Sequence, residues 1–311
     1  MTRRVLITGA GGFVCRQITA VLLSHDYAVI ANDRAFDDDL KRAWSAQWGG
    51  QLTLIEADVM QLPDLRVDAV VHGAAVTASP EERGQSPEAN FQANLDPLLR
   101  MFRWANANCT GRAIFISSDA IFERSDPGLI YETDPVVSLG LYGIAKQMTE
   151  SLVRTLQFLY GREMCTIRLG NIYGPLERAR PTRPRVSMVG QMIHEALTTQ
   201  QITVNVRAPA RDWTFAADVG RAVRRLIEAP TLNHALYQVA SEQVLTPMQI
   251  AETIQARLPA VQIRTVEAPV DVPRRGHMSH TRLHGELGFD EWTPFAVGIQ
   301  QIIAQQAEIL S

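Results

Sequence analysis

Residues 4–14, Arg-Val-Leu-Ile-Thr-Gly-Ala-Gly-Gly-Phe-Val, decide the fold. The first five form a short apolar and β-branched run, which predicts a strand over 4–8. From Phe13 onward apolar residues recur at helical spacing, so a glycine-rich turn joins the strand to a helix. A helix N-terminus presents unpaired N–H groups, and glycine lets a pyrophosphate approach the backbone closely. The stretch therefore predicts a nucleotide-binding turn at Gly9, Gly11 and Gly12.

An acidic residue closes the second predicted strand, which covers residues 28–32. It is Asp33, twenty-one residues after Gly12, where a carboxylate would accept hydrogen bonds from an adenosine ribose. A carboxylate there repels a 2′-phosphate, so NAD is favoured over NADP. Arg34 follows directly, and because an arginine can stack on adenine or pair with a phosphate, NADP stays open as the alternative.

Composition limits the class of protein. The 311 residues fit one large domain or two smaller ones, and 46% hydrophobic with 20% charged residues exclude a disordered chain. A formal net charge of -3 favours neither a nucleic-acid nor a membrane-surface partner, and no apolar run approaches the ~18 residues of a membrane span. Three widely spaced cysteines without a Cys-x-x-Cys pair favour neither disulfides nor a metal site, and they suit a cytoplasmic protein.

Two side chains four residues apart, Tyr142 and Lys146, indicate acid–base chemistry. On a helix this spacing stacks them on one face, where the lysine charge would lower the tyrosine pKa from its usual ~10 toward working pH. A buried strand predicted over 113–116 delivers Ser117, Ser118 and Asp119 to the edge at which the other strands end. The tyrosine is therefore a candidate base.

With these motifs the chain resembles the extended short-chain dehydrogenase/reductase family, which comprises NAD-dependent sugar epimerases, dehydratases and reductases. The family's Thr-Gly-x-x-Gly-x-x-Gly motif matches at residues 8–12, with Cys15 in place of its third glycine. Its acidic-hydrophobic pair matches 58–59, and its His-x-Ala-Ala matches 72–75. The resemblance implies an α/β fold, in which a Rossmann-type doubly wound parallel sheet precedes a smaller C-terminal substrate-binding lobe. The nucleotide domain is expected over 1–170, with a helix over 219–228 returning to it, and the lobe over 171–311.

The resemblance also implies roles for single residues. Ser118 would hydrogen-bond the reacting hydroxyl or carbonyl, Tyr142 would exchange its proton, and Lys146 would also hold the nicotinamide ribose. Residues expected to bind the cofactor are Gly9, Gly11, Gly12, Phe13, Val14, Asp33, Arg34, Asp58, Val59, Ala74, Ala75, Asn94, Tyr142 and Lys146. Residues expected to bind substrate are Ser118, Asp119, Asn171, Arg211 and Arg275.

Other segments are given structural or partner roles. Asp218 is interpreted as a helix N-cap, and residues 246–249 as a capping box. Residues 176–185 carry four arginines among prolines, which predicts a basic loop, either solvated or closing over an anionic substrate. The predicted helix over 142–160 is apolar around most of its girth, and by resemblance it indicates a homodimer.

The leading hypothesis is an NAD-dependent nucleotide-sugar 4-epimerase. Arg211 and Arg275 match the two arginine segments that hold the substrate diphosphate in such epimerases. The alternative is an oxidoreductase, either a dehydrogenase or a reductase, of a free sugar, a sugar acid or a 4-keto nucleotide sugar. Residues 118–122 favour this alternative, because they look closer to the keto-sugar reductase pattern Thr-Asp-x-Val-Phe than to the epimerases. A 4,6-dehydratase is disfavoured because Ala120 supplies no acid, and a nucleotide-binding regulator without turnover is a third hypothesis.

Overall fold

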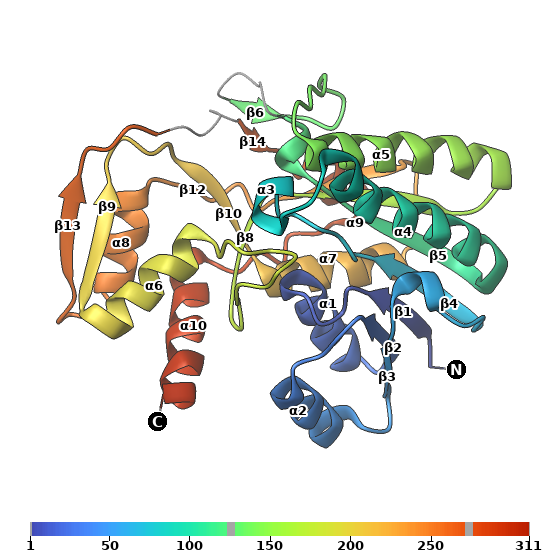
Figure 1. The fold of residues 1–311 in the computed structure, drawn as a ribbon, viewed down its shortest axis with the longest axis horizontal. Helices are drawn as coiled ribbons and strands as arrows, with labels where there is room; N and C mark the ends of the chain where they lie inside the picture. Colours follow the sequence, from blue (N-terminus) through green and yellow to red (C-terminus); the bar gives the residue numbers. More distant parts are fainter. Residues whose placement is uncertain (1, 123–127, 271–275, 311) are drawn as a thin grey trace.

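A computed structural model describes residues 2–122, 128–270 and 276–310. At its centre is a sheet of seven parallel strands in the order β11-β7-β5-β4-β1-β2-β3 (Figure 1). These strands are β1 (Arg4–Thr8), β2 (Ala28–Asp33), β3 (Leu52–Glu56), β4 (Val67–His72), β5 (Cys109–Ser118), β7 (Met164–Leu169) and β11 (Leu236–Val239). The strand order reverses between β1 and β4, and ligands of such sheets bind beside this reversal, outside the C-terminal strand ends. The predicted α/β fold is confirmed.

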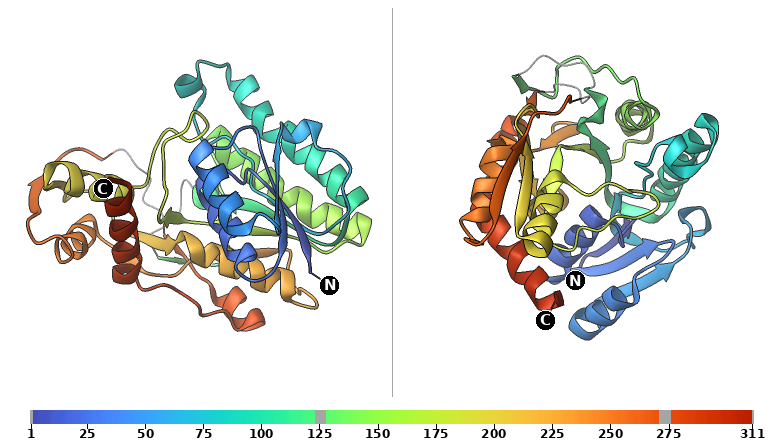
Figure 2. Two further views of the ribbon diagram at one scale, coloured as in Figure 1. Left: turned by 90° about the horizontal axis from the view of Figure 1, so that it is seen from below. Right: turned by 60° about the vertical axis from the view of Figure 1, so that its left-hand side comes forward.

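Helices cover both faces of the sheet (Figures 1 and 2). One face packs against α1 (Phe13–Leu23), α2 (Asp38–Trp48), α7 (Ala216–Glu228) and α9 (Thr281–Leu287), and the other against α4 (Pro87–Asn108) and α5 (Leu141–Tyr160). Val5 and Ile7 belong to the first core, whereas Leu6 belongs to the second. Because both faces are buried, the strands need continuous apolar runs rather than alternation.

A further core lies in the C-terminal part of the chain, on the left in Figure 1. Its helices are α6 (Met188–Thr199), α8 (Pro247–Gln255) and α10 (Phe295–Leu310). Its strands are β8 (Asn171–Tyr173), β10 (Arg211–Phe215) and β12 (Val244–Leu245) in one small sheet, and β9 (Gln201–Asn205) and β13 (Gln262–Val266) in another. The remaining elements are short, namely η1 (Val59–Gln61), α3 (Pro80–Arg83), η2 (Asp119–Ile121), and the paired strands β6 (Leu129–Ile130) and β14 (His277–Met278).

The chain returns to the seven-stranded sheet after its first passage through the C-terminal core. Helix α7 packs on α1, and β11 pairs with β7 as the edge strand. The helix that returns is predictable from the sequence, whereas the strand that returns is not. A run of four residues carries too little periodicity to be assigned to either sheet before the fold is known.

The interpretation of Asp218 as a helix N-cap is wrong. Helix α7 begins at Ala216 with Phe215 as its N-cap, so Asp218 lies inside the first turn. Its buried carboxylate instead accepts hydrogen bonds from the Thr293 N–H at 2.8 Å and the Thr293 hydroxyl at 2.7 Å, which joins α7 to the segment before α10. The capping box predicted at Thr246 is confirmed at the start of α8.

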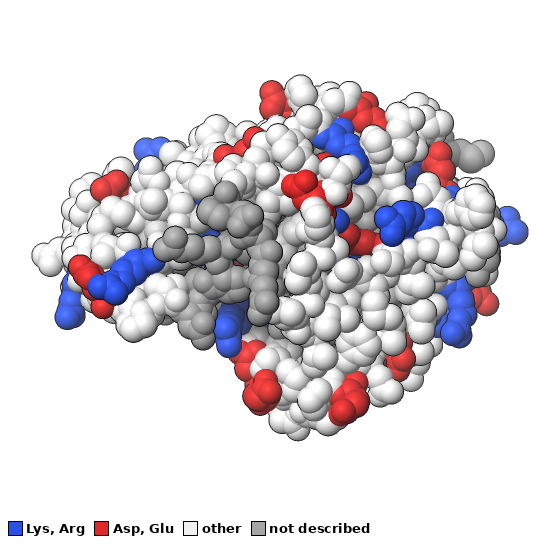
Figure 3. All heavy atoms as spheres, turned by 90° about the horizontal axis from the view of Figure 1, so that it is seen from above, with Lys and Arg blue, Asp and Glu red and all other residues white. Residues whose placement is uncertain are grey.

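The described residues show how charge is distributed on one face of the molecule and whether any helix could span a membrane. On the face drawn in Figure 3, Lys and Arg side chains are interspersed with Asp and Glu. Across 2–122, 128–270 and 276–310, we find no helix with the length and apolar character needed to span a bilayer. In the same ranges no three His, Cys, Asp or Glu side chains gather to hold a metal ion. Cys15, Cys109 and Cys165 are free and buried.

Candidate active site

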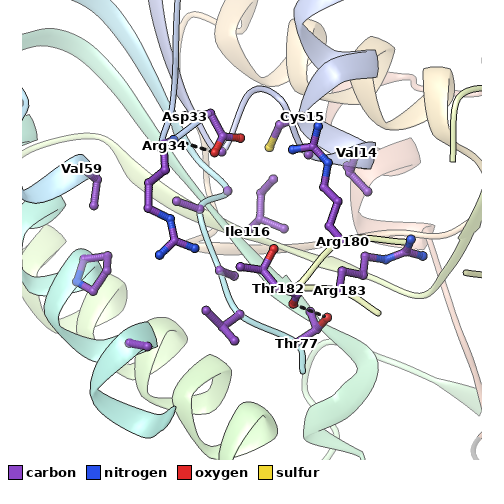
Figure 4. A pocket seen from close by; sticks show the side chains of 18 of the residues that line it. Val14, Cys15, Asp33, Arg34, Val59, Thr77, Ile116, Arg180, Thr182 and Arg183 are labelled. Carbon is purple, nitrogen blue, oxygen red and sulfur yellow. Dashed lines mark hydrogen bonds between the residues drawn. The ribbon is translucent and has the colours of Figure 1, made fainter. Parts of the chain in front are cut away.

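A cavity of about 590 Å³ opens at the C-terminal ends of β1, β2, β4 and β5, where the strand order reverses. It is lined by twelve of the fourteen residues predicted to bind cofactor, namely Gly9, Gly12, Phe13, Val14, Asp33, Arg34, Asp58, Val59, Ala74, Ala75, Tyr142 and Lys146. The other two, Gly11 and Asn94, do not line the cavity, but each forms hydrogen bonds with a residue that does. Gly11 supports Asp33, and the Asn94 amide holds the backbone of Val76 through two hydrogen bonds of 2.8 and 3.0 Å. Figure 4 shows the side chains that enter this cavity.

The glycine turn has the close approach that a dinucleotide requires. Gly9 has a φ of +69°, and an added Cβ would lie 2.8 Å from the Ala74 backbone, so a side chain is excluded on both counts. Gly12 is the N-cap of α1 and offers no capping side chain, which leaves the first amides of the helix open toward the cavity. An anion fits there because these amides and the helix dipole face it.

Asp33 ties the end of β2 to the glycine turn. One carboxylate oxygen accepts the Gly11 N–H at 2.9 Å, and the other accepts the Arg34 N–H at 2.7 Å. Asp58 accepts the Met60 N–H at 2.9 Å and thereby caps η1. Each carboxylate retains lone pairs that face the cavity it lines. With the glycine turn, these residues fit a dinucleotide.

Cys15 occupies the place where the family motif has its third glycine. Its thiol is buried, and burial raises its pKa to about 12. The sulfur packs against Gly73, where an added Cβ would overlap it. The larger side chain on α1 is therefore accommodated by a glycine at the end of β4.

Ser117 and Ser118 end β5 and point to different partners. The Ser117 hydroxyl donates to Glu150 at 2.6 Å, beneath the cavity. The Ser118 hydroxyl is within hydrogen-bonding reach of Tyr142 and accepts the Ala120 N–H at 3.2 Å. Ser118 is therefore the serine that meets Tyr142, whereas the Ser117 hydroxyl is engaged by Glu150 two turns further along α5.

The expected lowering of the Tyr142 pKa by Lys146 is wrong for this structure. Burial raises the pKa of Tyr142 to about 12, although the Ser118 hydrogen bond opposes the shift. The Lys146 ammonium lies 5.5 Å from the centre of the tyrosine ring and donates to the Ile116 carbonyl at 2.7 Å. Burial lowers the pKa of Lys146 to about 8. Burial thus favours the phenol over the phenolate in the cofactor-free protein.

A buried ion pair, Glu150–Arg168, lies next to Ser117 and Lys146. Glu150, one turn after Lys146 on α5, binds Arg168 on β7 through two hydrogen bonds of 2.8 and 2.9 Å. Its carboxylate also accepts the Ser117 hydroxyl, so it joins α5 to the ends of β5 and β7. Glu150 is not among the site residues predicted from the sequence. Its position two turns after Tyr142 was the available signal.

A second, smaller cavity lies beside the first, and Gly170 lines both. It is lined by three residues predicted to bind substrate, Asp119, Asn171 and Arg211. Ser118 lines the larger cavity, and Arg275 lies outside the described residues. The smaller cavity is also lined by Asp212, which is not among the site residues predicted from the sequence. Burial, then Glu242 and Asp119, raise the pKa of Asp212 to about 7.

The basic segment of residues 176–185 lies on the larger cavity. Arg178, Arg180 and Arg183 line it together with the glycine turn. The sequence pattern predicts a basic loop, but it does not predict that this loop lies beside the glycine turn.

Comparisons with known proteins agree with this geometry. The sequence model of the NAD dependent epimerase/dehydratase family matches residues 5–240. The chain is similar to dTDP-4-dehydro-6-deoxy-D-allose reductase of Streptomyces bikiniensis, with 23% identity over 316 residues, covering 96% of this chain and 94% of that protein. It is also similar to the solved UDP-N-acetylglucosamine 4-epimerase from Methanobrevibacter ruminantium M1 (TM-score 0.85, 21% identity, 99% of each chain). A UDP-glucose-4-epimerase from Stenotrophomonas maltophila with bound NAD has a TM-score of 0.86 at 17% identity over 99% of each chain.

Proposed function

Because the chain belongs to the NAD dependent epimerase/dehydratase family and works with NAD, we propose that it is a nucleotide-sugar 4-epimerase. One observation carries the proposal. The cavity with Asn171 and Arg211 adjoins the cleft that holds Ser118 and Tyr142, and the two meet at Gly170. An arginine suits a diphosphate because its planar guanidinium offers paired donors. A nucleotide sugar would thus place its diphosphate at Arg211 and its sugar ring at the tyrosine.

We assign NAD to the larger cavity. The first amides of α1 would receive its diphosphate, Asp33 its adenosine ribose, and Asp58 its adenine. Ala74 and Ala75 leave room on the path toward the nicotinamide, and Lys146 would hold the adjoining ribose. When bound, the cofactor supplies a hydride acceptor and donor for a sugar carbon.

The chain's own residues would move the proton. During oxidation the deprotonated form of Tyr142 would take the proton of a sugar hydroxyl, and during reduction the phenol so formed would return this proton to the keto oxygen. The positive charges of the Lys146 ammonium and of the oxidised nicotinamide favour the phenolate that the first step requires. Ser118 holds that oxygen, since its own hydroxyl reaches Tyr142. An epimerase must let the keto-sugar turn between the two steps, so Tyr142 serves both faces of the sugar without net redox change.

A keto-sugar reductase is the second candidate. Residues 118–122, Ser-Asp-Ala-Ile-Phe, are similar to the reductase pattern, and the curated relative described above is named as a reductase. Such a reductase exchanges its cofactor with solution after each turnover. An epimerase regenerates its cofactor within the cycle and needs no further cofactor from solution. Position 120, an alanine, offers no carboxyl group for a 4,6-dehydratase.

The test is the nicotinamide content of gel-filtered protein, followed by assays with UDP- and dTDP-sugars. We expect NAD near one per chain and interconversion of 4-epimers without added cofactor. An empty site, with keto-sugar reduction that consumes NADH stoichiometrically, would replace the epimerase with the reductase. Tight NAD binding without turnover of any sugar would favour the nucleotide-binding regulator.

A further inference from the structure

Residues 176–185, here called the arginine strap, form a hairpin across the cofactor cavity. The backbones of Arg180 and Arg183 exchange two hydrogen bonds of 2.9 Å, which leaves 181–182 at the tip. At the base, Glu177 accepts hydrogen bonds from Arg183 and from the Ser187 N–H at 2.8 Å. The strap is therefore a built hairpin fixed to the start of α6.

The tip of the strap is fastened to the far side of the cavity. The Thr182 carbonyl accepts the Thr77 N–H at 2.9 Å, the Ala78 N–H at 3.1 Å and the Thr77 hydroxyl at 3.2 Å. Thr77 follows β4, whereas the base of the strap follows β8. Figure 4 shows Thr182 meeting Thr77 while Arg180 reaches toward the glycine turn beside Val14 and Cys15. The strap thus crosses the cavity from the segment after β8 to the segment after β4.

Arg180 lies at the glycine turn itself. One guanidinium nitrogen is 3.3 Å from the position that a Cβ on Gly11 would occupy, and the other donates to Asp37 at 2.9 Å. The same Asp37 oxygen accepts Arg16 at 2.9 Å, and Arg16 also donates to the Gly11 carbonyl at 3.0 Å. Two guanidinium groups thus share the Asp37 carboxylate, whereas the second carboxylate at this turn, that of Asp33, accepts the Gly11 and Arg34 N–H groups.

We propose that Arg180 binds the diphosphate of the bound dinucleotide, and that the arginine strap keeps this cofactor in the cleft between turnovers. Arg180 lines the same cavity as the first residues of α1, and its guanidinium lies at Gly11, next to the helix N-cap Gly12. The Asp37 ion pair holds the guanidinium in position, so little conformational freedom is lost when the anion arrives. The three hydrogen bonds at Thr182 must break before the cofactor can leave.

The test is NAD binding to cofactor-stripped protein, which requires no sugar substrate. For Arg180→Ala we expect NAD affinity to fall by about tenfold to a hundredfold, because one hydrogen bond to a charged group is removed. The dissociation rate should carry most of this loss. The NAD affinity of Arg180→Lys should lie between those of the wild type and Arg180→Ala, since lysine keeps the charge but lacks the planar guanidinium. The wild-type affinity should weaken with added salt more steeply than that of Arg180→Ala.

Arg185→Ala is the matched control. Arg185 ends the same strap, but its side chain is 83% exposed, pairs with Glu82 and does not line the cavity. We expect wild-type NAD affinity for it. Limited trypsin digestion adds a second readout. Trypsin does not cleave before proline, so within the strap it can cut only after Arg178 and Arg185. NAD should protect the bond after Arg178 in the wild type and less so in Arg180→Ala.

Two results would overturn the proposal. One is equal NAD affinity and dissociation rate in the wild type, Arg180→Ala and Arg185→Ala. The other is unchanged NAD binding with a raised KM for the nucleotide sugar, which would place the arginine on the substrate. If Arg180→Ala does not fold, Arg180→Gln is measured in its place. A failure of the 4-epimerase assignment would leave these NAD measurements unaffected.

Discussion

The thiol of Cys15 on α1 occupies the place that a Cβ would take on Gly73, which follows β4, and it leaves no room for a side chain there. The helix has a larger residue where the family has glycine, and the neighbouring strand end has a glycine that admits it. We therefore expect Gly73→Ala to cost about 1–3 kcal/mol of unfolding free energy through overpacking. Thermal unfolding measures this loss, and NAD affinity should fall with it because both residues line the cofactor cavity.

The control for this prediction is the double variant Cys15→Gly/Gly73→Ala. Removing the thiol should restore most of the lost stability, less about 1 kcal/mol for a glycine inside a helix. A double-mutant cycle should give a coupling energy of at least about 0.5 kcal/mol. Strictly additive losses would mean that the two residues do not oppose each other.

Tyr142 is expected to carry the proton transfer. Tyr142→Phe keeps the ring and removes the hydroxyl, so turnover should fall by about a hundredfold or more while NAD binding is retained. The exposed Tyr131 provides the matched variant, Tyr131→Phe, which should keep wild-type activity. Near-normal turnover of Tyr142→Phe would remove Tyr142 from the mechanism.

Glu150 is expected to be essential for stability. Glu150→Gln leaves the Arg168 guanidinium, which is buried, without its counter-ion, and this should cost about 3–5 kcal/mol. The ion pair of Arg207 with Glu267 is exposed, so Glu267→Gln should change stability by no more than about 1 kcal/mol. Urea unfolding of both variants gives the comparison. Equal effects would show that Glu150 is not a buried counter-ion.

The end of helix α5 carries the surface expected to pair two copies of the chain. Phe158 is 87% exposed and Leu159 is 64% exposed, although both are large apolar side chains. We expect light scattering to show a homodimer for the wild type and a monomer for Phe158→Asp/Leu159→Asp. Val297→Asp, at an exposed apolar position on α10, should stay dimeric. A monomeric wild type would contradict the expectation.

The elements nearest the cofactor were the most predictable from sequence. The pattern placed the strand at Arg4–Thr8 and the start of the helix at Phe13 where the structure has them, because turn chemistry and periodicity coincide there. Such short-range features depend on neighbours along the chain.

Features set by tertiary packing could not be predicted. The four arginines of the strap indicate a basic loop, but only the path of the chain after Gly174 decides that Arg180 meets the glycine turn. Likewise, the spacing of Tyr142 and Lys146 gives the shared helix face, while the pKa of the tyrosine depends on burial by other elements. Burial proved the larger effect, so the predicted direction was reversed.

Asp212 should make the stability of the protein depend on pH. Its pKa is about 7 in the folded state against 3.8 as a free side chain, because burial and the nearby Glu242 and Asp119 disfavour its charge. Below pH 3.8 the carboxyl group is protonated in both states and costs nothing. As pH rises toward 7 only the unfolded chain loses the proton, so the folded state loses stability by up to about 4 kcal/mol. Asp212→Asn removes this titration. The variant should therefore gain stability over the wild type between pH 4 and 7, and the gain should level off above pH 7. Thermal unfolding across pH 4–8 measures the difference, and a gain that is constant over this range would refute the assigned pKa.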